Sequence, residues 1–172
     1  MIRPAVAADA PAVAAILARE IEARAAHFAT VAPTAAAVAE EIAGTGAHPF
    51  LVATDGDALA GFARTTPWKS RGAYAWTVEL GVYLAEAWQR RGIGRALAVA
   101  TLDLARTRGF RTVLAGIALP NPASVGLVEA LGFRHVGTLP AVGYKHGAWR
   151  DVGYWALRLG DDGPPGAAPG VS

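Results

Sequence analysis

The chain has no cysteine among its 172 residues and only two lysines, Lys69 and Lys145. Without cysteine there is no disulfide framework, no thiol nucleophile and no thiolate metal site, and we expect no metal. No apolar run approaches the ~18 residues that a membrane-spanning helix needs, so we expect no membrane association. Hydrophobic residues make up 53% and charged residues 17%. Length and composition predict one folded domain, with the cytoplasm as its compartment.

Positive charge is also scarce, and most of it is carried by arginine. The formal net charge is +2, and the main basic cluster consists of Arg90, Arg91 and Arg95. A nucleic-acid-binding protein would carry a longer basic stripe interleaved with aromatic residues. The cluster matches the size of one pyrophosphate with a nearby phosphate. We therefore expect a small phosphate-bearing ligand and no nucleic acid.

Hydrophobic periodicity predicts a chain of alternating strands and helices. The order of elements predicts one α/β domain with a mixed sheet over residues 1–159. Residues 160–172 are rich in glycine and proline without periodicity, and we expect a disordered tail. Asp55-Gly56-Asp57 is a strong hairpin signal, and Asp9 and Thr34 are candidate helix caps. We expect helices at 9–24, 34–44, 93–108 and 122–131, and strands at 2–6, 50–54, 58–66, 75–84, 111–117, 135–139 and 152–159.

The segment between the strand at 75–84 and the helix at 93–108 carries the clearest functional pattern. Its two glycines let the backbone approach a ligand closely. The N–H groups at the start of the helix favour an anion, and arginine adds donors suited to phosphate. The pattern predicts a phosphate-binding loop made of Gln89, Arg90, Arg91, Gly92, Ile93, Gly94 and Arg95.

A dinucleotide-binding turn is the competing interpretation of Gly92-Ile93-Gly94. The preceding strand lies in mid-chain, and no acidic residue follows at the spacing that binds a ribose. A P-loop would require Gly-Lys-Ser or Gly-Lys-Thr, and the chain contains neither. Both nucleotide-binding readings are therefore disfavoured.

Two segments together resemble the coenzyme-binding motifs of the GCN5-related N-acetyltransferases, the GNAT superfamily. The first is the loop at 89–95, which holds the pyrophosphate in that family. The second, residues 121–133, begins with Asn121 and ends in Leu-Gly-Phe. The resemblance implies the GNAT fold, whose central sheet is mostly antiparallel and flanked by helices, and acetyl-coenzyme A as co-substrate. It also implies coenzyme contacts from Val82, Leu84, Asn121 and Ser124.

Residues 67–79 and 143–155 further resemble the phosphinothricin and methionine-sulfoximine N-acetyltransferases. This implies acetylation of the α-amine of a small amino-acid-like substrate by a homodimer. Lys69, Arg71 and Tyr74 would supply donors to an anionic acceptor, or form a solvated turn anchored by Trp68. Phe28 resembles an aromatic position of the family's substrate pocket, with simple core packing as the alternative.

Acetyl transfer needs a base, because an α-amino group is mostly protonated at neutral pH. Glu79 is a lone carboxylate in an apolar strand, where desolvation would raise its pKa towards the useful range. The resemblance places a glutamate in this role at the same position. The alternative is a carboxylate at the rim of the site paired with an arginine.

The chain departs from its relatives at two positions. They carry His or Tyr where this chain has Val128, beside the thiol, and valine cannot protonate a leaving thiolate. Tyr83, His27 or water could replace it, or the thiolate could leave unassisted at a pKa of about 8.5. Ala29 stands where an arginine would help to hold an anion, which weakens the case for phosphinothricin itself. Acetylation of another amine (another amino acid, an antibiotic or a polyamine) and a weakly active acyl-coenzyme A sensor are the alternatives.

Overall fold

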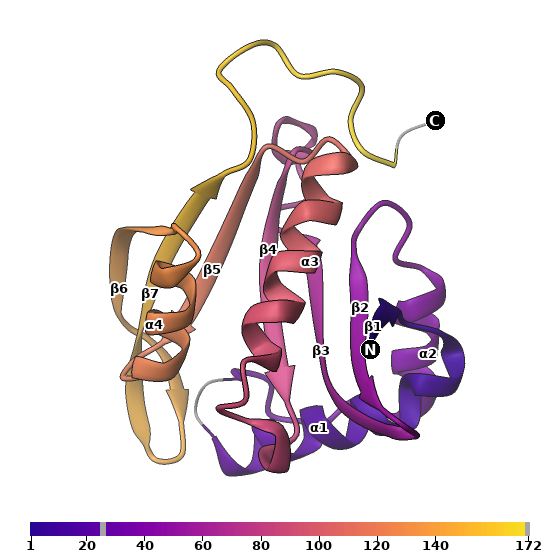
Figure 1. Ribbon diagram of the computed structural model, residues 1–172. Coiled ribbons are helices and arrows are strands. Elements are labelled where there is room, and N and C mark those ends of the chain that lie inside the picture. The colour runs from indigo at the N-terminus through magenta and orange to yellow at the C-terminus, as the bar shows by residue number, and fades with distance from the viewer. Residues whose placement is uncertain (25–26, 171–172) are drawn as a thin grey trace.

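A computed structural model describes residues 1–24 and 27–170 of the chain. Within these residues a seven-stranded sheet has the order β1-β2-β3-β4-β5-β7-β6 (Figure 1). Neighbouring strands are antiparallel except β4 and β5, which run parallel. The predicted mixed, mostly antiparallel sheet is confirmed. The strands are β1 (Ile2–Pro4), β2 (Phe50–Asp55), β3 (Ala58–Pro67), β4 (Thr77–Leu84), β5 (Thr112–Ala118), β6 (Arg134–Lys145) and β7 (Ala148–Arg158).

Helices cover both faces of this sheet (Figure 1). α1 (Ala10–Ala23) and α2 (Ala35–Ala43) pack on one face, where they share a buried cluster with β2 and β3. α3 (Ile93–Thr107) and α4 (Pro122–Ala130) pack on the opposite face, and their buried side chains meet those of β4, β5 and β7. Side chains alternate along β4, so Val78 and Leu80 face α3 while Tyr83 faces α1.

The two predicted helix caps differ in outcome. The Thr34 hydroxyl accepts a hydrogen bond from the Ala37 N–H at 3.1 Å, so this cap is confirmed. The Asp9 cap was wrong, because the short turn η1 (Ala7–Asp9) already makes Asp9 helical. Its buried carboxylate instead accepts two bonds from Arg3, both at 2.7 Å, and one from the Val6 N–H at 2.9 Å.

The last two strands are longer than the sequence predicts. β6 and β7 form one hairpin closed by His146 and Gly147, whose φ angles are 52° and 72°. Positive φ at both central residues matches the twist of a two-residue hairpin turn. Glycine, lysine and histidine near this turn made the segment look like a connection in the sequence. Residues 160–170 follow without a helix or strand, and Asp161 there accepts a bond from Arg111 at 2.7 Å.

β4 and β5 are paired over only three residues, Thr77–Glu79 with Thr112–Leu114. Beyond Glu79, β4 stays on β3 as far as Leu84, while β5 stays on β7 as far as Ala118. The two parallel strands therefore separate and leave an opening in the centre of the sheet. Among the described helices, none has both the length and the apolar character to cross a bilayer.

Candidate active site

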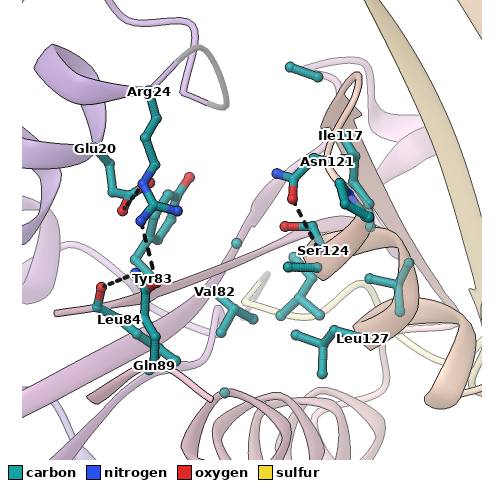
Figure 2. Close-up of a pocket in the computed structure, with 18 of the residues that line it drawn as sticks. Glu20, Arg24, Val82, Tyr83, Leu84, Gln89, Ile117, Asn121, Ser124 and Leu127 are labelled. Atoms are coloured by element: carbon teal, nitrogen blue, oxygen red, sulfur yellow. Dashed lines mark hydrogen bonds and ion pairs between the residues drawn. The ribbon is translucent and has the colours of Figure 1, made fainter. Parts of the chain in front are cut away.

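A cavity of about 720 Å³ fills the opening between β4 and β5. Its walls come from the two separated strands, the loop before α3 and the start of α4 (Figure 2). Nearly all of the predicted coenzyme residues line it: Val82, Leu84, Gln89, Arg90, Gly92, Gly94, Arg95, Asn121 and Ser124. Arg91 and Ile93 do not line it. The Arg91 guanidinium lies over the Trp88 ring at 5.1 Å, and Ile93 packs into the core beneath α3.

The loop before α3 turns the start of the helix towards this cavity. Arg90 and Gly92 both have left-handed backbone, with φ of 61° and 79°. This conformation suits Gly92, which has no Cβ, but it strains the backbone at Arg90. Such strain is common where the backbone is shaped to bind a ligand. No side chain caps the first turn of α3, so its N–H groups are free to bind an anion.

Asn121 links the opposite wall to the start of α4. Its side-chain oxygen accepts a hydrogen bond from the Ser124 N–H at 3.1 Å and caps the helix (Figure 2). The cap uses only the amide oxygen, which leaves the Nδ2 group available to donate into the cavity. The wall thus offers a polar side chain beside apolar ones from Leu127 and Val128.

Glu79 lies where β4 and β5 separate. Its half-buried carboxylate faces Gly116 of β5 across the opening. Burial raises the pKa of Glu79 above its usual value, against the opposing effects of the Gly116 backbone N–H and of the Lys69 charge. Within residues 1–24 and 27–170 no arginine is within ion-pair distance of this carboxylate, which disfavours the rim interpretation.

Two tyrosines lie on the same face of the sheet as Glu79. Tyr83 lines the cavity and stacks on Phe62 with ring centroids 5.0 Å apart. Tyr154 lies opposite Gly116 in the β5–β7 ladder. Burial is the main cause that raises the pKa of each phenol, and the Glu79 charge adds to the effect, so both stay protonated. Nothing in the sequence singled out Tyr154, because only strand register brings it to the site.

The residues predicted to bind substrate lie outside the cavity lining. Lys69 and Tyr74 pack on Trp68, with the Lys69 ammonium 5.3 Å above its ring and Tyr74 edge-on at 5.0 Å. Arg71 is exposed in the same turn, and the turn reaches the site through the Lys69 charge that acts on Glu79. Phe28 packs against Gly143 of β6 and keeps 38% of its surface exposed. The cavity is instead lined by charged residues that sequence reasoning missed: Glu20, Arg24 and Arg150.

The sequence motifs predicted an anion-binding helix start, and the structure turns the start of α3 towards a cavity between two separated strands. Residues 15–133 match the model of the acetyltransferase (GNAT) family. The chain belongs to this family. It is therefore an N-acetyltransferase, and its acetyl donor is acetyl-coenzyme A, as predicted from the two motifs. The anion-facing loop at one end of the cavity and the Asn121 amide along its wall fit this coenzyme.

Individual relatives of this GNAT enzyme support the assignment over most of its length. The phosphinothricin N-acetyltransferase of Streptomyces viridochromogenes is 43% identical over 165 residues, which cover 95% of this chain and 90% of the relative. The L-methionine sulfoximine/L-methionine sulfone acetyltransferase of Salmonella typhimurium is 36% identical over 120 residues, 70% of each chain. The crystal structure of a phosphinothricin acetyltransferase from Sinorhizobium meliloti in complex with acetyl-coenzyme A matches with a TM-score of 0.92. It is 30% identical, and the match covers 98% of this chain and 94% of that one.

Proposed function

We propose that this enzyme acetylates the α-amine of a small amino-acid-like acceptor, such as phosphinothricin, methionine sulfoximine or methionine sulfone, with Glu79 as the general base. The observation that carries the proposal is the position of Glu79 where β4 and β5 separate. Its carboxylate is half-buried and has a raised pKa. The names of the relatives supply the acceptor class.

The phosphate loop and the cavity walls would hold the coenzyme. The free N–H groups at the start of α3, with Arg90 and Arg95, suit the diphosphate. Beyond Glu79 the edge of β4 that faces β5 pairs with no other strand in the described part of the chain, although the Leu84 carbonyl accepts a hydrogen bond from Gln89 Nε2. The other backbone groups near Val82 and Leu84 are available to the pantetheine arm. The remaining contacts that we propose are those of Gln89, Gly92, Gly94, Asn121 and Ser124.

The coenzyme supplies an activated acetyl thioester, and the protein residues manage the protons. Glu79 takes a proton from the acceptor's ammonium group, and the neutral amine then forms the new C–N bond as the C–S bond breaks. The second proton that the nitrogen loses on becoming an amide balances the proton that the leaving thiolate gains. The raised pKa makes Glu79 a better match to this task than an ordinary carboxylate. Tyr83 and Tyr154 are protonated phenols on the same side of the sheet as Glu79. Either can give a proton to the leaving thiolate, a role that Val128 cannot fill.

We also propose a homodimer that works in the cytoplasm, where acetyl-coenzyme A is available. β6 is the edge strand of the sheet and is long, with exposed apolar side chains along it and its turn. Such an edge needs cover, and a second copy of the chain related by two-fold symmetry provides it. The exposed side chains are Val136, Leu139, Val142, Tyr144 and Trp149.

Glu79→Gln tests the catalytic proposal. We expect turnover on phosphinothricin or methionine sulfone to fall by about 10²- to 10⁴-fold, because the amine loses its base. The dissociation constant for acetyl-coenzyme A should stay near wild type. Steady-state kinetics and calorimetric titration measure both quantities. Turnover of the variant equal to that of wild type would refute the role of Glu79. Wild-type enzyme that binds the coenzyme but turns over no amine would favour a sensor.

The same variant should be more stable at neutral pH. Since folding raises the pKa of Glu79, its contribution to stability is present below the unfolded-state pKa of about 4.3 and is lost as the pH rises through the folded pKa. Gln cannot ionise and avoids this loss. The melting temperature of Glu79→Gln should therefore be higher than that of wild type at pH 7, and the two should converge near pH 4.

A further inference from the structure

We infer that Arg150 binds a second, anionic group at the far end of the acceptor and so selects amino acids with an acidic side-chain terminus. The inference rests on the proposed function and names the acceptor chemistry that the same site prefers. Arg150 lies on β7, two residues before the buried Val152, and lines the cavity between β4 and β5.

Strand register puts Arg150 on the acceptor side of the sheet. In β7, Tyr154 lies opposite Gly116 and Arg150 lies opposite Gly143. Alternate residues of a strand share a face, so Arg150 and Tyr154 point the same way. A Cβ at Gly116 would meet Glu79, and a Cβ at Gly143 would meet Phe28. Arg150 therefore stands between the catalytic carboxylate and the loop that carries Phe28.

Arg150 also has no ion-pair partner among the residues that the structure describes. The other arginines of the lining are Arg24, Arg90 and Arg95. Arg24 pairs with Glu20 at 3.4 Å (Figure 2), and Arg90 and Arg95 belong to the phosphate loop. The buried Nε of Arg150 has no hydrogen-bond partner in the part of the chain that the structure describes. Leaving a buried donor unsatisfied is costly, and an oxyanion of the acceptor would satisfy it.

The other cations near the loop that carries Phe28 have partners of their own: Lys145 donates to the carbonyl oxygens of His27 and Ala29, and Arg64 pairs with Glu41. Residues 27–33 contain neither lysine nor arginine, and Ala29 occupies the position where an arginine would help to hold an anion. Lys69 and Arg71 lie outside the cavity lining, and the Lys69 ammonium rests on Trp68. Arg150 on β7 is therefore the residue that we expect to bind the anionic end of an acceptor inside the cavity.

The spacing selects the distal group of the acceptor. Arg150 and Tyr154 are four positions apart along the strand, which corresponds to about 13 Å at ~3.3 Å per residue. An α-carboxylate is one carbon away from the amine, so it stays near Glu79 when the amine is in place. The side-chain terminus is the part of a small amino acid that extends towards Arg150. A guanidinium can pair with two oxygens of a phosphinate or carboxylate at once.

Arg150→Gln tests the inference with two acceptors that differ in their distal group. Phosphinothricin ends in an anionic phosphinate, whereas methionine sulfone ends in an uncharged sulfone. We expect kcat/KM for phosphinothricin to fall by about 10- to 100-fold, since one charge-assisted pair is lost. The value for methionine sulfone should fall by much less, because its distal group carries no charge, and the KM for acetyl-coenzyme A should stay near wild type. Arg150→Lys should recover part of the loss, because it restores the charge without the planar fork.

Arg106→Gln is the matched control. Arg106 is exposed on α3 and pairs with Asp103, so the variant removes the same charge away from the cavity. Its kinetics should equal wild type on both acceptors. Equal losses on both acceptors in Arg150→Gln would mean that Arg150 holds the α-carboxylate, and a raised KM for acetyl-coenzyme A would mean that it holds the coenzyme. No loss on phosphinothricin would mean that it holds neither. Each of these results overturns the inference.

Binding separates this inference from the proposed function. If the wild-type enzyme acetylates neither acceptor, the proposed function fails. Calorimetric titration of phosphinothricin into the coenzyme A complex then decides the role of Arg150. Binding by wild type that is lost in Arg150→Gln supports the inference, and binding that is absent or equal in the two proteins contradicts it.

Discussion

Glu79 reaches across the open sheet because residue 116 has no side chain. A Cβ at Gly116 would lie 2.6 Å from the Glu79 Oε1 atom and 3.1 Å from the Tyr154 ring. The first contact is with the end of a flexible side chain, so the carboxylate would move before the backbone did. The position of the proposed base therefore depends on a glycine in the neighbouring strand.

Gly116→Ala should leave the fold intact and reduce catalysis. We expect kcat to fall by about 10²-fold, because a displacement of about 1 Å of a catalytic group has an effect of this size. Steady-state kinetics and thermal melting separate the two effects. Gly126→Ala in α4 is the control, since a Cβ there meets nothing within 4 Å. It should keep full activity and gain up to about 1 kcal/mol of helix stability. Full activity in Gly116→Ala would show that the fit at Gly116 is unimportant.

At the scale of elements, the β6–β7 hairpin holds the loop between α1 and α2. The buried Lys145 ammonium donates hydrogen bonds to the carbonyl oxygens of His27 at 2.5 Å and Ala29 at 3.1 Å. Phe28, between these residues, packs against Gly143 of the same strand. These contacts tie the hairpin to the loop between α1 and α2.

Lys145→Met should loosen this loop and weaken acceptor binding. Two charge-assisted hydrogen bonds are lost, so we expect the KM for the acceptor to rise by about tenfold while the KM for acetyl-coenzyme A stays unchanged. Limited proteolysis should cut the loop faster in the variant. Arg134→Met removes an exposed positive charge from the same strand and should change neither quantity. An unaltered acceptor KM in Lys145→Met would contradict the holding role.

At the scale of the whole molecule, the exposed apolar surface gathers at one edge of the sheet. Tyr144 and Trp149 are 61% and 65% exposed and pack edge-on against each other with ring centroids 5.3 Å apart. They flank the turn of the β6–β7 hairpin, at the edge opposite β1. This surface is the one that we propose a second copy of the chain covers.

Trp149→Lys should convert the proposed dimer into a monomer, because a charge would have to be buried at the interface. Light scattering coupled to size-exclusion chromatography measures the mass directly. Val6→Lys places the same charge beside β1 at the far edge of the sheet, and the measured mass should remain that of a dimer. A wild-type protein that runs as a monomer would contradict the homodimer, and a dimeric Trp149→Lys would place its interface elsewhere.

The sequence by itself determined the features that depend on neighbouring residues. The Thr34 cap, the turn at Asp55-Gly56-Asp57 and the loop before α3 are each encoded within a few residues. Backbone conformation and hydrogen bonding over such distances follow from residue type. The two coenzyme motifs are contiguous segments for the same reason, so family, fold and donor could be predicted from the sequence.

Only the tertiary structure decided which distant residues share the acceptor side. Gly116 and Tyr154 meet Glu79 through the register of β5 and β7, and Lys145 reaches His27 across 118 positions. The sequence assigned substrate binding to Lys69 and Arg71, which lie outside the cavity, and did not find Arg150. A one-residue shift in register moves every side chain to the other face, and local residue preferences do not set the register between distant strands. The proposed acceptor site therefore depends on how distant strands pair, whereas the donor site is encoded in contiguous segments of the sequence.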